Sequence, residues 1–117
     1  MPVLKPADGS ATAAIIWIQG ADIAAEAYIP VAQAVQNATN GIWVAIPSFL
    51  ENLADPLTMD KAIASAEKEL TAAGMPAGTP ILLAGHSLGG SVVEAHLAKN
   101  VPSNIKGAIL MGSFIQR

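Results

Sequence analysis

One short stretch of the sequence combines residue types at a spacing that could do chemistry. The letters GHSLG, residues 85–89, follow the pattern G-x-S-x-G between an apolar run at 80–84 and a helix-like stretch at 91–99. A sharp strand-to-helix turn strains the backbone of its serine, and side chains at Gly85 and Gly89 would collide there. Ser87 Oγ would then stand above the carboxyl ends of the strands, at the positive end of a helix dipole. These surroundings suit a nucleophilic serine.

The same glycine-rich turn permits two other interpretations. In the simpler one, Ser87 only caps the helix that follows. In the other, the turn cradles a nucleotide phosphate, but a dinucleotide pattern G-x-G-x-x-G starting at Gly85 needs glycine where Ser87 stands. That pattern also needs an acidic residue near the end of the next strand, and residues 105–117 contain none. The sequence therefore disfavours nucleotide binding.

The elements that must position Ser87 alternate along the chain. Near-continuous apolar runs predict buried strands at 13–19, 42–46, 80–84 and 105–111. Apolar residues at three-to-four spacing predict helices at 26–37, with Pro30 in the first turn, at 59–73, with Thr58 as N-cap, and at 91–99. This order predicts an α/β fold, a mostly parallel sheet with helices on both faces in three layers. Asp8-Gly9 further predicts a hairpin that pairs residues 3–5 with strand 13–19.

Composition narrows the classes of protein that the chain can be. The 117 residues suit one domain, and only 13% are charged, against about 25% in typical soluble proteins. Six scattered basic residues and a net charge of −3 leave no patch for nucleic acid. No apolar run reaches the ~18 residues of a membrane span, residues 1–6 lack a signal-peptide pattern, and cysteine is absent. We therefore expect a soluble, unprocessed chain without a membrane span, a metal or a cofactor.

The serine turn, extended to GHSLGG at 85–90, resembles that of the α/β-hydrolase superfamily, in the form found in lipases, esterases, thioesterases and chlorophyllase-like enzymes. The resemblance covers nearly all of the chain, from WIQG at 17–20 to GAILMGSF at 107–114. It implies that Ser87 is the nucleophile of a nucleophile elbow formed with Gly85 and Gly89.

The resemblance also implies an oxyanion hole made of two backbone N–H groups. One belongs to Leu88, which follows the serine. The other belongs to Ala21, which follows the pair Gln19-Gly20 where the family usually has His-Gly.

By the same resemblance, the four main strands look like the third to sixth of a fold that normally has eight. In that fold the triad acid follows the seventh or sixth strand, and the histidine follows the eighth. We therefore expect residues 1–117 to be a single domain or the N-terminal fragment of an α/β-hydrolase domain, a partial fold whose base lies beyond Arg117. The low charged fraction agrees, because half a sheet keeps its core strands and lacks part of its surface.

Nearby residues do not complete a triad. His86 should point into the fold and pack there. His96 lies nine positions after Ser87, about 13 Å along a helix, whereas a catalytic base must come within about 3 Å. The acidic residues expected to face solvent or helix ends are Asp22, Glu26 and Glu94.

Together these features predict a serine hydrolase that acts on small-molecule carboxylic esters or thioesters through an acyl-enzyme and is inactive as this chain alone. Its base would come from a complementing C-terminal half or a second chain. The alternative is a non-catalytic hydrolase-fold module that uses the sheet edge after Met111 to form a homo-oligomer or bind a partner.

Substrate selectivity would rest on the loops at 21–25 and 48–57. Four apolar residues of the second loop either line a pocket for an apolar acyl or alcohol group or pack beneath the loop: Phe49, Leu50, Leu53 and Leu57.

Overall fold

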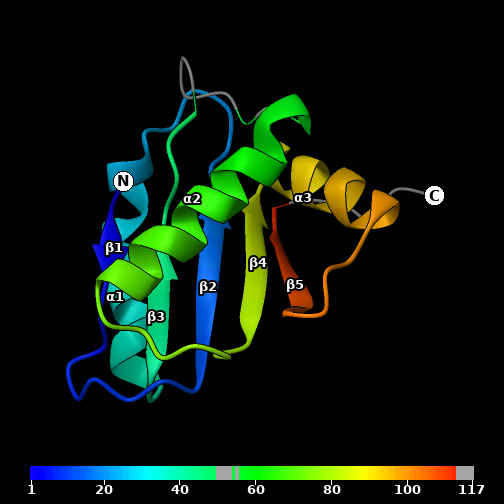
Figure 1. Cartoon of the computed structure of the whole chain (residues 1–117). Coiled ribbons are helices and arrows are strands. Elements are labelled where there is room, and N and C mark those ends of the chain that lie inside the picture. Colours follow the sequence, from blue (N-terminus) through cyan, green and yellow to red (C-terminus); the bar gives the residue numbers. More distant parts are fainter. Residues whose placement is uncertain (50–53, 55, 113–117) are drawn as a thin grey trace.

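The computed structural model describes residues 1–49, 54 and 56–112 and contains one five-stranded sheet (Figure 1). The strands lie in the order β1-β3-β2-β4-β5. Their bounds are β1 Val3–Leu4, β2 Ala13–Ile18, β3 Ile42–Ala45, β4 Ile81–His86 and β5 Ile105–Met111. Strands β3, β2, β4 and β5 run parallel to one another, so their carboxyl ends meet at one edge of the sheet. The predicted, mostly parallel sheet is confirmed.

The predicted hairpin at the amino terminus is wrong. The turn exists, since Gly9 N donates to Pro6 O at 3.0 Å, but β1 pairs antiparallel with β3, through Val3 opposite Ala45. The reason is that β3 and β4 occupy both sides of β2. A short strand can then add only at an outer edge of the sheet, and β1 adds beside β3.

Helices cover both faces of the sheet, which confirms the three layers (Figure 1). The 3-10 helix η1, Ala25–Tyr28, leads into α1, Ile29–Ala38, on one face, with Pro30 in the first turn as predicted. On the other face lie α2, Met59–Ala72, which follows the 3-10 helix η3, Pro56–Thr58, and α3, Leu88–Lys99. No helix in the described ranges is long and apolar enough to cross a membrane.

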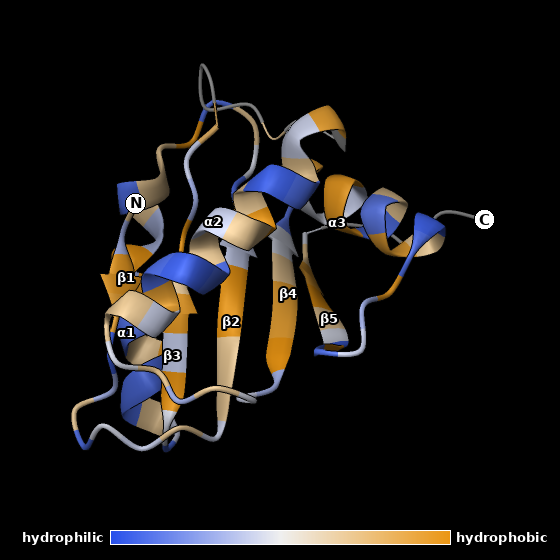
Figure 2. Cartoon of the chain, viewed as in Figure 1, coloured by the Kyte–Doolittle hydropathy of each residue, from blue (hydrophilic) through white to orange (hydrophobic). Residues whose placement is uncertain are grey.

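Two apolar cores fill the spaces between the layers, because the central strands are buried on both faces. Alternate β2 residues point to opposite sides: Ile16 and Ile18 face α2 and α3, whereas Ile15 and Trp17 face α1. Figure 2 shows the resulting apolar strands and the polar outer turns of α2.

The strand and helix around the serine meet more closely than the sequence predicted. Strand β4 continues to His86, and α3 begins at Leu88. Ser87 is the one residue between them, so the whole change of direction occurs at its backbone.

Candidate active site

The backbone of Ser87 is strained. Its φ is 54° and its ψ is −116°, a conformation that side-chain-bearing residues rarely adopt. The residue is exposed, and its Oγ makes no hydrogen bond within the described part of the chain. The Ser87 side chain is therefore exposed at the carboxyl end of β4, a central strand.

Two glycines make this turn possible. A Cβ built on Gly85 would lie 2.5 Å from Gly90 Cα, in the first turn of α3. A Cβ on Gly89 would lie 2.5 Å from the backbone oxygen of Gln19, at the end of β2. The collisions expected from the sequence are thus real, and they are with backbone, which cannot move aside as a side chain could. The second one also shows that the end of β2 touches the start of α3.

The first turn of α3 leaves the N–H of Leu88 available beside the serine. Gly90 N and Ser91 N donate to Ser87 O at 3.0 and 3.3 Å, and Ser87 N donates to Met111 O at 2.9 Å. Leu88 N has no acceptor among the described residues. Because α3 is 12 residues long, its dipole adds partial positive charge there. This N–H can therefore stabilise an oxyanion.

The loop after β2 is held by the buried side chain of Gln19, which is 0% exposed. Its amide nitrogen donates to Ile23 O, and its amide oxygen accepts the N–H of Phe49 at 3.0 Å. Gln19 therefore ties its own loop to the segment after β3. Within that loop Ala21 is exposed, and its N–H finds no acceptor among the described residues.

A second support joins this loop to the serine turn. Tyr28 Oη accepts the N–H of Gly20 at 2.6 Å and lies 2.9 Å from Nδ1 of His86. His86 thus packs inward against Tyr28, as expected. The sequence predicted only that Tyr28 lies in the helix at 26–37. The signal that could have found it is that Tyr28 is the single tyrosine of the chain, and the hydroxyl of a buried tyrosine usually finds a hydrogen-bond partner.

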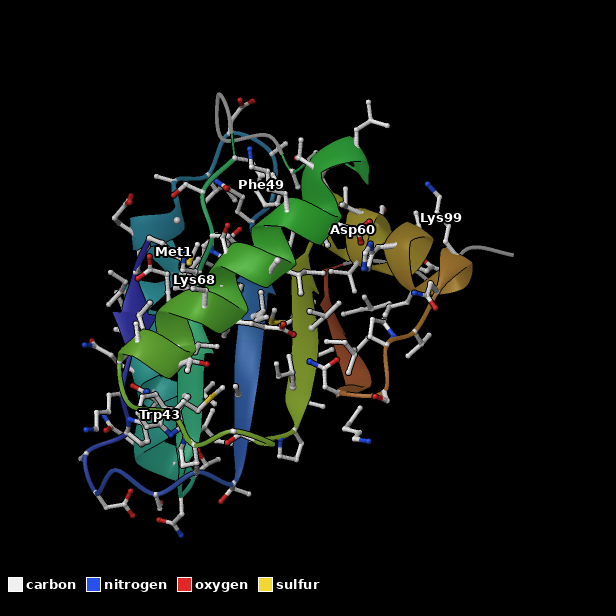
Figure 3. All side chains as sticks on the ribbon, in the orientation of Figure 1. Met1, Trp43, Phe49, Asp60, Lys68 and Lys99 are labelled. Carbon is white, nitrogen blue, oxygen red and sulfur yellow. The ribbon has the colours of Figure 1, made fainter. Side chains whose placement is uncertain are left out.

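The other acidic residues and the second histidine do not pair with Ser87 in the described part of the chain. His96 Nδ1 is 3.5 Å from Asp60 Oδ1, where α3 passes the start of α2 (Figure 3), which agrees with a packing role. Asp22 and Glu26 are exposed. Within the described ranges, neither histidine hydrogen-bonds to Ser87 and no cluster of metal-ligating side chains occurs.

Of the four apolar residues predicted either to line a substrate pocket or to pack beneath the loop, the two that the structure describes have different environments. Phe49 is 9% exposed and belongs to the core between the sheet and α2, near the carboxyl ends of the strands (Figure 3). For Phe49 the structure favours packing in the core over lining a pocket. Leu57 is 91% exposed, while Leu50 and Leu53 lie outside the described residues.

Comparison with known proteins identifies the family. Residues 14–117 match the sequence model of the alpha/beta hydrolase family, so the chain belongs to that family. A solved structure described as "Lipase (Open form)" superimposes with a TM-score of 0.62 at 20% identity over 92% of this chain. The chain spans 37% of the length of that lipase, so what it shares with the lipase is part of an α/β-hydrolase fold. No curated protein matches the chain.

Proposed function

We propose that this protein is a serine hydrolase that acts on carboxylic esters or thioesters, with Ser87 as nucleophile. The observation that carries the proposal is the strained, exposed Ser87 at the junction of β4 and α3, with φ of 54°. Ser87 Oγ attacks the carbonyl carbon as its proton passes to a base, and the N–H groups of Ala21 and Leu88 stabilise the oxyanion. Loss of the alcohol or thiol leaves an acyl-enzyme, which water hydrolyses to the acid.

In this proposal the base comes from outside the described residues. His86 is engaged with Tyr28, and His96 lies beside Asp60. A longer protein or a second chain would bring the histidine and acid to Ser87. The chain alone should therefore show no turnover, because deprotonation of the serine contributes a large part of catalysis in such enzymes.

The alternative, a non-catalytic module that self-associates or binds a partner, has one observation in its favour. Strand β5 ends the order of the sheet, and its Ile109 is 40% exposed. Edge strands are templates for pairing with another chain.

Labelling by a fluorophosphonate tests the proposal. The probe is incubated with the folded chain, without and with tens of millimolar imidazole as a replacement base, and adducts are counted by intact mass and mapped to a residue. We expect slow labelling that imidazole accelerates, confined to Ser87 and absent from Ser87→Ala. Ser91→Ala, one helical turn away, is the matched control and should label like wild type. An adduct that persists in Ser87→Ala, or folded wild type that gains none with imidazole, contradicts the proposal and favours the non-catalytic module.

A further inference from the structure

We propose that Tyr28 and His86 are positioning residues that fix the loop after β2 against the serine turn, so that Ala21 and not Gly20 presents its N–H to the substrate oxygen. This inference rests on the proposed function. It concerns two side chains that touch neither Ser87 nor, in the mechanism above, the substrate.

The hydrogen-bonding capacity of Tyr28 sets the direction of the contacts. A tyrosine hydroxyl has one proton to donate and can accept from others. It accepts the Gly20 N–H at 2.6 Å, so its own proton needs an acceptor, and Tyr28 is 7% exposed. The acceptor at hand is His86 Nδ1, 2.9 Å away. His86 therefore carries its proton on Nε2.

These contacts decide which N–H of the loop remains available. Gly20 is buried, and its N–H is already bound by Tyr28. The next N–H, that of the exposed Ala21, is left unbound within the described part of the chain. A donor whose hydrogen bond is already formed cannot stabilise an oxyanion without losing it. The tyrosine thereby selects Ala21.

The same contacts fix the position of the Ala21 N–H relative to the Leu88 N–H, the two donors of the proposed oxyanion hole. A Cβ built on Gly20 would lie 2.9 Å from His86 Nδ1 and 3.2 Å from His86 O, so the loop packs directly on the residue before Ser87. Ala21 follows Gly20, and Leu88 follows Ser87. Holding Gly20 to His86 through Tyr28 therefore holds the two donors at a fixed spacing, which is the preorganisation that oxyanion stabilisation needs.

Tyr28 can be changed with little disturbance of its surroundings. Its ring centroid lies 5.8 Å from that of Trp17, and Tyr28→Phe keeps this ring contact while removing the hydroxyl. His86→Asn keeps an acceptor close to the position of Nδ1, whereas His86→Leu removes it. The three variants separate the hydrogen-bond chain from simple packing.

Amide exchange and ¹⁵N NMR of the folded chain test the inference without any reaction. In wild type we expect a His86 ring protonated on Nε2 and a Gly20 amide protected from exchange. Protection of Gly20 should fall at least about tenfold in Tyr28→Phe and His86→Leu, the loss of roughly one hydrogen bond, and should be retained in His86→Asn. Amides of β3 should exchange as in wild type in all three variants. Equal Gly20 protection in Tyr28→Phe, or a His86 ring protonated on Nδ1, would overturn the inference.

The imidazole-assisted labelling of Ser87 supplies a readout that a merely structural role would not move. Tyr28→Phe and His86→Leu should slow labelling roughly ten- to a hundredfold while the variants remain folded. His86→Asn should label at close to the wild-type rate. Wild-type rates in Tyr28→Phe contradict the positioning role while leaving Ser87 as nucleophile. If instead wild type does not label although Gly20 is protected as described, the proposed function fails and the hydrogen-bond chain stands as a structural feature only.

Discussion

The two neighbours of β4 differ in how they are covered. On one side, β2 is buried along nearly its whole length, with α1 on one face and α2 and α3 on the other, and Ile16 and Ile18 are 0% exposed (Figure 1). On the other side, β5 has α3 on one face, and Ile109 is 40% exposed. Ser87 lies between these sides, at the end of β4.

The difference shows where the support of the serine turn comes from. Gln19 and Gly20 at the end of β2, together with Tyr28, hold the loop that faces the turn. To β5 the turn donates one backbone hydrogen bond, from Ser87 N to Met111 O. The β2 side thus supplies the side-chain hydrogen bonds that hold the loop of Ala21 against the serine turn. In our proposal a longer protein or a second chain brings the base to Ser87.

The largest effect on stability should come from truncating a buried side chain on β2, and the same truncation on the more exposed β5 should cost less. Ile16→Ala removes a fully buried side chain and should lower the free energy of unfolding by about 2–5 kcal/mol. Ile109→Ala on β5 should cost about 1 kcal/mol, because much of that side chain is already in water. Urea unfolding followed by circular dichroism measures both. Equal losses that grow with protein concentration would show that β5 is covered by a second copy, as the non-catalytic module requires.

A smaller difference in stability should separate two glycine substitutions, one at Gly89, which contacts the end of β2, and one at Gly107 on β5. Gly89→Ala places a Cβ against the backbone oxygens of Ile18 and Gln19 and should destabilise the fold by about 3 kcal/mol, the upper range for overpacking. Gly107→Ala on β5 meets first the flexible end of Leu82, at 3.2 Å, and should change stability by less than about 1 kcal/mol. Thermal unfolding of the two variants side by side checks this. Comparable losses would mean that the end of β2 and the start of α3 are not in contact.

The smallest effect on stability should come from Asp8, in the turn before β2, which lies away from the serine turn. Hydrogen bonds from the hydroxyl and then the N–H of Ser10 lower the pKa of Asp8 below its ordinary value of 3.8. A lowered pKa stabilises the fold above that ordinary value, and this contribution is lost as the pH falls through the lowered pKa. Asp8→Ala should therefore lower the melting temperature slightly at pH 7, and the difference from wild type should vanish in acid. A difference that persists at low pH assigns the effect to something other than the carboxylate.

Much of this arrangement could be predicted from the sequence, because it depends on local patterns. Buried apolar runs identified the four main strands, and the glycine spacing identified the strained turn at Ser87. The pairing of β1 could not be predicted in this way, since it depends on which strand edge remains free after β2 acquires two neighbours. The partners of Gln19 and Tyr28 were equally out of reach, because Phe49 and His86 are distant in sequence and meet them only in the folded chain.

A crystal structure of the chain after phosphonylation in the presence of imidazole tests most directly whether Ser87 is the nucleophile and whether Ala21 and Leu88 form the oxyanion hole. We expect one adduct, on Ser87 Oγ, with the phosphonyl oxygen about 2.7–3.1 Å from the N–H groups of both Ala21 and Leu88, and with Gly20 still bound to Tyr28. An adduct on another residue, or one on Ser87 whose phosphonyl oxygen points away from these two N–H groups, would contradict it.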